Sequence, residues 1–343
     1  MVLPSLSMFS VKLLRDLTVL EKGQFTSSDL FHQIQREYTY HSLSLAYNAQ
    51  VFPGNYEDFS VVAFYDEKPV LCCYIFTSGT SFRFFNDPAQ IFYLEVNPEL
   101  LWMSFTKTIA FIKGLIQSHN FTELTFYSNG HFVNSFYDKI KSSRIEHFGM
   151  IDLHIQSDLI KTNVRKSYKS LINWGFHNLK LQVISGRDVE LTEFIKFRDF
   201  HIHVAGRTTR SDESWMTQFE MLQQNKAYLV TGYYQDKLVA ASYILHGSET
   251  AYYGIGVYDR ELMAEDLPLS HYTLYFSILH AQKLGLLYFN MGNLDPGESA
   301  KSRSIALFKK GFTTFVQSRI SYTVSFLKPD SFPKPKEVRD DED

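Results

Sequence analysis

Scarce cysteine, the lack of a long apolar run and a near balance of charge set the first limits on this sequence of 343 residues. The two cysteines, Cys72 and Cys73, are adjacent, so they cannot form a disulfide framework and lack the spacing of a zinc site. Such usage is typical of a reducing compartment, and we predict a cytoplasmic protein. No stretch approaches the roughly 18 apolar residues of a membrane-spanning helix, which leaves at most peripheral contact with a membrane.

Neither sign of charge dominates, because 34 Lys and Arg stand against 37 Asp and Glu, for a net charge of -3. This balance argues against a surface built for nucleic acid, and we predict no DNA partner, although a local basic cleft is compatible with it. The sequence also lacks a nucleophile elbow, a zinc-protease motif, a phosphate-binding P-loop and a complete dinucleotide fingerprint. The closest histidines, His201 and His203, point to different sides of a predicted helix, so we predict no metal site.

Aromatic residues are abundant, at 16% with 30 Phe and 21 Tyr, and the length suits two domains. An internal repeat supports two related domains: residues 65–75 and 234–244 share five identities in eleven positions at an offset of 169. The predicted elements that follow each repeat also keep their order. We therefore predict a structural duplication, with domains at 1–157 and 158–327 and a disordered acidic tail at 328–343.

The predicted elements are mixed in type. In the first half they are a hairpin at 59–78, strands at 90–96, 122–127 and 146–155, and helices at 99–119 and 131–141. In the second half, helices at 161–174, 188–205 and 211–225, with a strand at 179–184, precede the repeated hairpin. After it come strands at 250–257 and 286–290, helices at 268–284 and 302–310, and closing strands from 312 to 327.

Two basic stretches without acidic residues interrupt the second half. In the first, Lys161, Arg165 and Lys169 are spaced to share one face of the predicted helix, with Lys166 nearby. This face is either simply solvated or binds the phosphate of a nucleotide, a coenzyme or a tRNA. In the second, Lys309 lies between two apolar residues and Gly311, so it either stabilises an oxyanion or a phosphate, or only complements the helix dipole.

The strand at 250–257 carries Gly254 and Gly256 in an otherwise β-rich run, a pattern that marks a bulge or the close approach of a ligand. The neighbouring Tyr252 and Tyr253 are therefore candidates to stack on a substrate or to donate hydrogen bonds to it. Packing in the core is the alternative role for these tyrosines.

Together these features resemble the Fem/GNAT-like superfamily of FemAB-type peptidyltransferases and related N-acyltransferases, most strongly over residues 160–315. The segments that carry the resemblance are the basic run 161–169, Tyr252-Tyr253-Gly254, Leu267-Pro268-Leu269-Ser270, the run 281–292 and Phe308-Lys309-Lys310-Gly311-Phe312. The resemblance implies an α+β (mixed α/β) fold of tandem GNAT-like domains, each a largely antiparallel mixed sheet flanked by helices.

The resemblance also implies the transfer of an activated acyl or aminoacyl group to an amine. Lys309 matches the family's lysine near the reacting carbonyl, and Arg165 with Lys166 matches its phosphate-contacting helix. Tyr253 is the second catalytic candidate, and the remaining binding candidates are Lys161, Lys169, Arg207, Arg210, Tyr252, Ser270 and His271. The general base stays open among residues close in sequence, namely Glu249, Asp259, Glu261, Asp266 and His271, or a chain of water molecules.

Two departures from the family leave the donor open. The loop by which acetyl-CoA enzymes cradle pyrophosphate is missing in both halves, and no heptad run predicts the coiled-coil arm of some tRNA-using members. We predict no tightly bound cofactor and a donor that is acyl-CoA, acyl carrier protein or aminoacyl-tRNA. The acceptor is predicted to be an amine of a cell-envelope precursor, an amino-sugar nucleotide or a similar phosphate-containing metabolite.

Three functions follow in order. The first is an N-acyltransferase that uses a thioester, with a catalytic second domain and a structural or acceptor-binding first domain. The second is a tRNA-dependent aminoacyl transferase of the peptidoglycan type, and the third is a non-catalytic binding protein with the same fold. The oligomeric state is left open.

Overall fold

The computed structural model describes residues 9–52, 54 and 56–327, so the predicted tail at 328–343 lies outside the described residues. The fold is of the mixed α+β class, and the chain forms two compact units that are each discontinuous in sequence. Unit 1 comprises the described residues within 1–18, 55–144 and 321–343, and unit 2 comprises those within 19–54 and 145–320. These units do not follow the consecutive ranges 1–157 and 158–327 that the sequence predicts for the domains.

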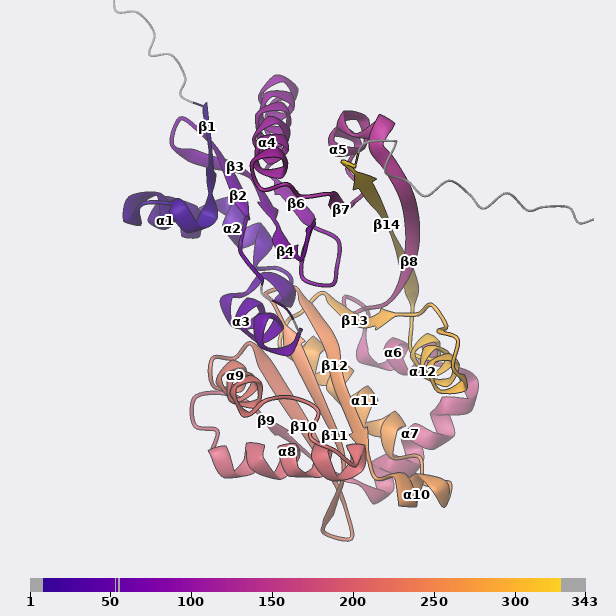
Figure 1. The fold of residues 1–343 in the computed structure, drawn as a ribbon. Coiled ribbons are helices and arrows are strands. Elements are labelled where there is room, and N and C mark those ends of the chain that lie inside the picture. Colours follow the sequence, from indigo (N-terminus) through magenta and orange to yellow (C-terminus); the bar gives the residue numbers. More distant parts are fainter. Residues whose placement is uncertain (1–8, 53, 55, 328–343) are drawn as a thin grey trace, which may run out of the picture. The chain divides into compact units, whose positions relative to one another are not determined.

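Unit 1 is built on an antiparallel sheet that packs against one long helix (Figure 1). The strands, in spatial order, are β1 (Phe9–Leu13), β2 (Val61–Tyr65), β3 (Lys68–Tyr74) and β6 (Gln90–Tyr93). The helix is α4 (Pro98–Ser118), which begins where the Asn97 side chain accepts a hydrogen bond from the Leu100 N–H. Its apolar face, which includes Phe105, Ile109 and Ile112, is buried in the core of the unit.

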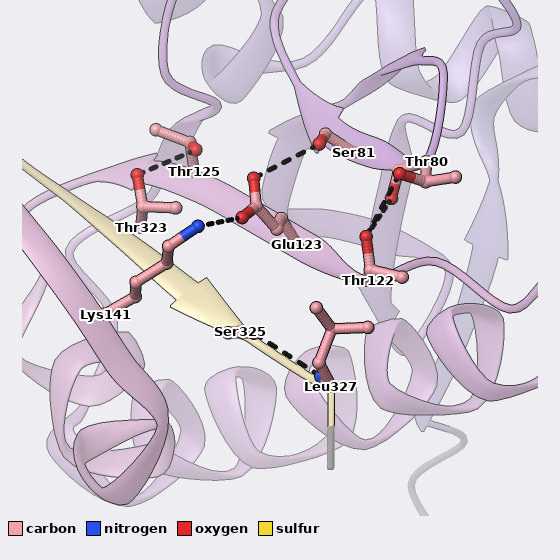
Figure 2. Close-up of polar contacts among 9 residues, drawn as sticks. All are labelled: Thr80, Ser81, Thr122, Glu123, Thr125, Lys141, Thr323, Ser325 and Leu327. Atoms are coloured by element: carbon pink, nitrogen blue, oxygen red, sulfur yellow. Dashed lines mark hydrogen bonds and ion pairs between the residues drawn. The ribbon is translucent and has the colours of Figure 1, made fainter. Parts of the chain in front are cut away.

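A second group of strands in unit 1 joins segments from distant parts of the sequence. These strands are β4 (Phe76–Ser78), β5 (Ser81–Arg83), β7 (Glu123–Tyr127) and residues 321–325 of β14 (Phe315–Ser325). Figure 2 shows the polar contacts along β7, where Glu123 accepts a hydrogen bond from Lys141 and Thr125 bonds with Thr323. The helices α5 (Gly130–Ser135), η1 (Leu14–Asp16) and η3 (Tyr137–Lys139) complete the unit.

Unit 2 is a twisted sheet with helices on both faces (Figure 1). Its strands are β9 (Lys180–Ile184), β10 (Ala227–Tyr234), β11 (Lys237–His246), β12 (Thr250–Tyr258) and β13 (Tyr288–Asn293), followed by residues 148–152 of β8 (Ile140–Asp152). Helices α8 (Leu191–Ala205) and α9 (Asp212–Gln223) cover one face, and α7 (Lys166–Asn178) and α11 (Leu269–Lys283) cover the other. Alternation along β10 serves both layers, because Tyr228 packs with α11 while Leu229 packs with α9.

The repeated hairpins have the same local geometry. The turn of the first hairpin, Asp66-Glu67, and that of the second, Gln235-Asp236, have positive φ at both central residues, as a two-residue type I′ turn requires. Each hairpin also has a register shift at its first strand, before Phe64 in β2 and before Tyr233 in β10, again 169 residues apart. The internal repeat therefore marks two structurally equivalent hairpins.

Two predicted elements differ in the structure. The helix predicted over 161–174 is interrupted and forms α6 (Ser157–Asn163) and α7, because Val164 and Arg165 have extended backbone conformations. Lys161 therefore does not share a helical face with Lys169. The closing strands predicted from 312 to 327 are a single strand, β14.

The first 58 residues carry elements that the sequence did not predict. In unit 2 these are α1 (Val19–Thr26), α2 (Asp29–Ile34), η2 (Tyr38–Tyr40) and α3 (Ser42–Val51). The remaining helices of this unit are α10 (Arg260–Ala264) and α12 (Ala300–Lys310). Within the described ranges, no helix combines the length and apolar character needed to traverse a lipid bilayer.

Candidate functional site

A pocket of about 610 Å³ opens in unit 2 where β12 and β13 part. The two strands pair in parallel only from Thr250–Tyr288 to Tyr252–Asn290, and β12 continues beyond that point without β13 as a partner. From β12 the pocket is lined by Tyr252, Tyr253, Gly254, Gly256 and Tyr258, and from α12 by Ser304, Ile305, Leu307, Phe308 and Lys309. Tyr168, Met263, Ser270 and His271 close it from α7, α10 and α11.

Lys309 is held at the end of this pocket that lies next to β13. Its Nζ donates to the Asn293 carbonyl at 3.5 Å, and a Cβ placed on Gly292 would lie only 3.1 Å from the same Nζ. Gly292 has φ +79°, a conformation that glycine adopts without strain, so the strand turns here and leaves room for the amine beside Tyr252. Burial lowers the pKa of Lys309. Among the lining residues that the structure describes, Lys309 alone carries a formal charge.

A chain of three hydroxyl groups lies along the floor of the pocket. The Tyr253 and Tyr258 hydroxyls are 2.8 Å apart, and the Tyr258 hydroxyl is 3.2 Å from the Ser242 Oγ. This arrangement depends on Gly256, because a Cβ there would lie 1.9 Å from the Tyr253 hydroxyl. Burial raises the pKa of both tyrosines, so both phenols stay protonated at neutral pH.

The bulge predicted from the glycines is present. Tyr243 is paired with Ile255 and Ile244 with Tyr253, so Gly254 is the extra residue of β12. The extra residue shifts the alternation of side chains along the strand, which places Tyr253 over Gly256 on the face that carries Tyr258.

His271 lies in an aromatic cluster on the helical side of the pocket. Its ring centroid is 4.5 Å from that of Tyr168 and 5.3 Å from that of Phe308, and its Nδ1 is 3.4 Å from the Ser270 Oγ. Burial lowers the pKa of His271 to about 4, so the imidazole is neutral at physiological pH. It can therefore exchange hydrogen bonds with a ligand but does not bind it as a cation.

This pKa shift predicts a pH-dependent stability. The unfolded chain titrates His271 near pH 6.5 and the folded chain near pH 4, so the unfolded state binds more protons between these values. The free energy of unfolding should therefore fall as the pH falls through this window. His271→Phe keeps an aromatic ring and removes the titrating group, so urea unfolding should show a smaller loss of stability on acidification. His177→Phe, at an exposed position on α7, is the control, and an unchanged pH slope in His271→Phe would contradict the assignment.

The predicted basic helix does not line the pocket. The Arg165 backbone N–H donates to the Gly311 carbonyl at 2.8 Å, and its guanidinium lies 5.7 Å from the centroid of the Tyr168 ring, so this residue stands beside the pocket. Lys166 follows it on α7 and is exposed. Lys169 lies on the next turn of α7, and the Lys161 Nζ donates to the Asn173 Oδ1 at 2.7 Å. Of the four, only Arg165 has a printed contact with a lining residue.

The two other predicted arginines lie between α8 and α9, away from the lining residues. Arg207 is exposed, whereas the Arg210 guanidinium lies 4.7 Å from the centroid of the Trp215 ring. The Arg210 Nη1 is buried and has no hydrogen-bond partner in the part of the chain that the structure describes. Both arginines stay predictions as donor-binding residues.

The acidic candidates for a general base are not among the residues that line the pocket. Glu249 forms an ion pair with Arg36 at 3.2 Å, and Asp259 pairs with Lys237 at 3.0 Å while it caps α10. Glu261 and Asp266 also lie outside the lining set. Within the described residues, no three His, Cys, Asp or Glu side chains gather closely enough to hold a metal ion.

Sequence reasoning found part of the lining and missed the rest. It singled out Tyr252, Tyr253, Ser270, His271 and Lys309, which the fold brings together in one pocket. It missed Tyr258 and the apolar side chains Met263, Ile305 and Leu307. The available signal was their position, because Tyr258 ends the glycine-containing strand and the two α12 residues precede Lys309 by one helical turn or less.

Comparison with known proteins identifies the fold. The sequence matches no family model, and no curated protein matches it. Among solved structures, FemX superposes with a TM-score of 0.59 at 9% identity, over 78% of this chain and 88% of FemX. A conserved protein of unknown function from Bacteroides thetaiotaomicron gives a TM-score of 0.56 at 11% identity, over 92% and 100% of the chains.

L-PGS from Bacillus licheniformis gives a TM-score of 0.54 at 10% identity, over 91% of this chain and 93% of that structure. These likenesses extend over most of each chain, so they concern the whole fold rather than one shared hairpin. The chain has the α+β fold of the Fem/GNAT-like superfamily, as the resemblance in its sequence implied.

Proposed function

We propose that this protein is an N-acyltransferase that forms an amide between an activated acyl group and an amine. The donor is an acyl thioester of coenzyme A or of acyl carrier protein. The acceptor is an amine of a cell-envelope precursor, an amino-sugar nucleotide or a similar metabolite. The observation that carries the proposal is the position of Lys309, held beside Gly292 and Tyr252 at one end of a pocket that is otherwise uncharged.

The reaction requires three tasks that the site can perform. The amine attacks the thioester carbonyl and forms the C–N bond, and the C–S bond breaks as the thiolate leaves. Lys309, in its protonated form, stabilises the negative oxygen of the tetrahedral intermediate. Tyr253, whose phenol stays protonated at neutral pH, donates a proton to the departing thiolate. Since no carboxylate lines the pocket, the neutral imidazole of His271 and water are the available acceptors for the amine proton.

The fold supports transferase chemistry, because FemX, which has the same fold, is an aminoacyl transferase. This likeness also favours the second candidate, a tRNA-dependent aminoacyl transferase, for which Arg165, Lys166 and Lys169 would contact the tRNA backbone. The proposed location is cytoplasmic, and residues 1–157 are proposed to be structural or to bind the acceptor.

The test incubates the full chain with each donor and a panel of amines, and follows mass-shifted products. The donors are acetyl-CoA, dodecanoyl-CoA, dodecanoyl acyl carrier protein and lysyl-tRNA. An amide product formed from a thioester in the absence of tRNA supports the proposal. A product formed only from lysyl-tRNA establishes the second candidate instead. If donors bind and none is consumed with any amine, the protein is a non-catalytic binding protein.

A further inference from the structure

The pocket at Lys309 is elongated rather than round. It follows β12 from Tyr252, next to Lys309, to Tyr258 and to Met263 in the adjoining α10. These six steps along a strand span roughly 20 Å at about 3.3 Å per residue. Since an extended chain advances about 1.2 Å per bond, the groove has the length of on the order of a dozen carbon atoms.

The walls of this groove are mostly carbon. Three of its side chains are apolar and unusually exposed for their size: Met263 at 42%, Ile305 at 46% and Leu307 at 54%. Phe308 and Tyr168 add aromatic surface. Exposed apolar side chains that gather at one concave site mark a surface that an apolar ligand covers.

The polar groups of the groove are largely bonded to one another. The Tyr253 and Tyr258 hydroxyls pair at 2.8 Å, and Ser242 is the next partner in the chain. No acidic side chain lines the groove, and Lys309 supplies its charge at one end only. A sugar or a peptide would therefore find few partners along this length, whereas a hydrocarbon chain would find contacts throughout.

We propose that the groove binds an extended hydrocarbon acyl chain, with its carbonyl at Lys309 and its methyl end near Met263. This inference rests on the proposed function for the position of the carbonyl. It goes further in naming the substrate class, a medium-chain to long-chain acyl donor, and in assigning chain-length selection to Met263 and Ile305. Each buried methylene contributes a factor of about four to affinity, so a long chain should bind far more tightly than acetyl.

The first test is direct binding, which needs no acceptor. Isothermal titration of the full chain compares dodecanoyl-CoA, octanoyl-CoA, acetyl-CoA and free coenzyme A below the micellar concentration. We expect the dissociation constant of dodecanoyl-CoA to be at least 10²-fold lower than that of acetyl-CoA. If the two agree within threefold, or if free coenzyme A binds as tightly as dodecanoyl-CoA, the groove does not hold the acyl chain and the inference is overturned.

Variants place the chain in this groove. Ile305→Asp should weaken dodecanoyl-CoA at least tenfold and leave acetyl-CoA within threefold, and Met263→Trp should shift the preference from dodecanoyl to octanoyl. The matched control is Leu284→Asp, because Leu284 is exposed to 47% at the end of α11 and lies outside the lining set. Equal losses in Ile305→Asp and Leu284→Asp would overturn the assignment.

The two proposals can fail separately. Chain-length-dependent binding with no transfer to any amine would remove the proposed function and leave the groove as a hydrocarbon site. Transfer at rates that do not depend on chain length, from C2 to C12 donors, would leave the proposed function and remove the hydrocarbon groove.

Discussion

Lys309→Met lowers kcat by about 10²–10³-fold and leaves the KM for the donor within a few-fold, if Lys309 stabilises the oxyanion. Methionine keeps an unbranched side chain of similar length but carries no charge. The reason for a selective effect on kcat is that the negative charge on oxygen develops only in the transition state. Steady-state kinetics with dodecanoyl-CoA and an amine identified from the panel would measure both constants.

The chain itself offers the control for this experiment. Lys310 is the next residue of α12, is exposed and does not line the pocket, so Lys310→Ala should keep the wild-type kcat. A rise in KM with unchanged kcat in Lys309→Met would instead assign Lys309 to donor binding. Equal losses in the two variants would mean that the general basic charge of α12 matters rather than the held amine.

Gly311→Val lowers the free energy of unfolding by roughly 2–3 kcal/mol, because a side chain at this position overlaps an aromatic ring. A Cβ on Gly311 would lie 2.1 Å from the Tyr168 ring. Tyr168 cannot move aside easily, since it is only 8% exposed and packs against His271 and Phe312. The backbone of Gly311 is in the right-handed helical region, so the expected loss comes from overlap and not from backbone strain.

Urea unfolding measures this loss, and Gly23→Ala is the matched control. Gly23 lies in α1 of the same unit, and a Cβ there would meet nothing within 4 Å. That variant should be as stable as the wild type or more stable by up to about 1 kcal/mol, because alanine favours the helix. A Gly311→Val protein within about 0.5 kcal/mol of the wild type would show that Tyr168 relaxes without cost.

The hairpins and the principal helices could be predicted because their signals are local. Alternating apolar residues and a polar two-residue turn define the hairpins at residues 65–75 and 234–244, and helical spacing defines α4. The break at Val164 could not be predicted, because it depends on distant partners. Val164 is buried in the core with residues of α11 and β13, and the Arg165 backbone bonds to Gly311.

The candidate site divides in the same way. Lys309 and Tyr253 were found from neighbouring residues, namely a terminal glycine in one case and glycines within a strand in the other. The hydrocarbon side of the pocket was missed because the exposure of Met263, Ile305 and Leu307 is a property of the fold and not of their own sequence positions. The basic residues at 161–169 were weighted too closely to the site, because the prediction assumed one uninterrupted helix.

The pairing of β7 with β14 has a consequence for biosynthesis. Residues 123–127 of unit 1 bond to residues 321–325, and the contact between Thr125 and Thr323 spans 198 positions. During translation the N-terminal part of unit 1 leaves the ribosome early but lacks a strand partner until almost the whole chain has emerged. Unit 1, which contains the start of the described chain, is therefore completed last, and a nascent chain arrested before residue 321 would expose an unpaired β7 edge that invites association with chaperones or other chains.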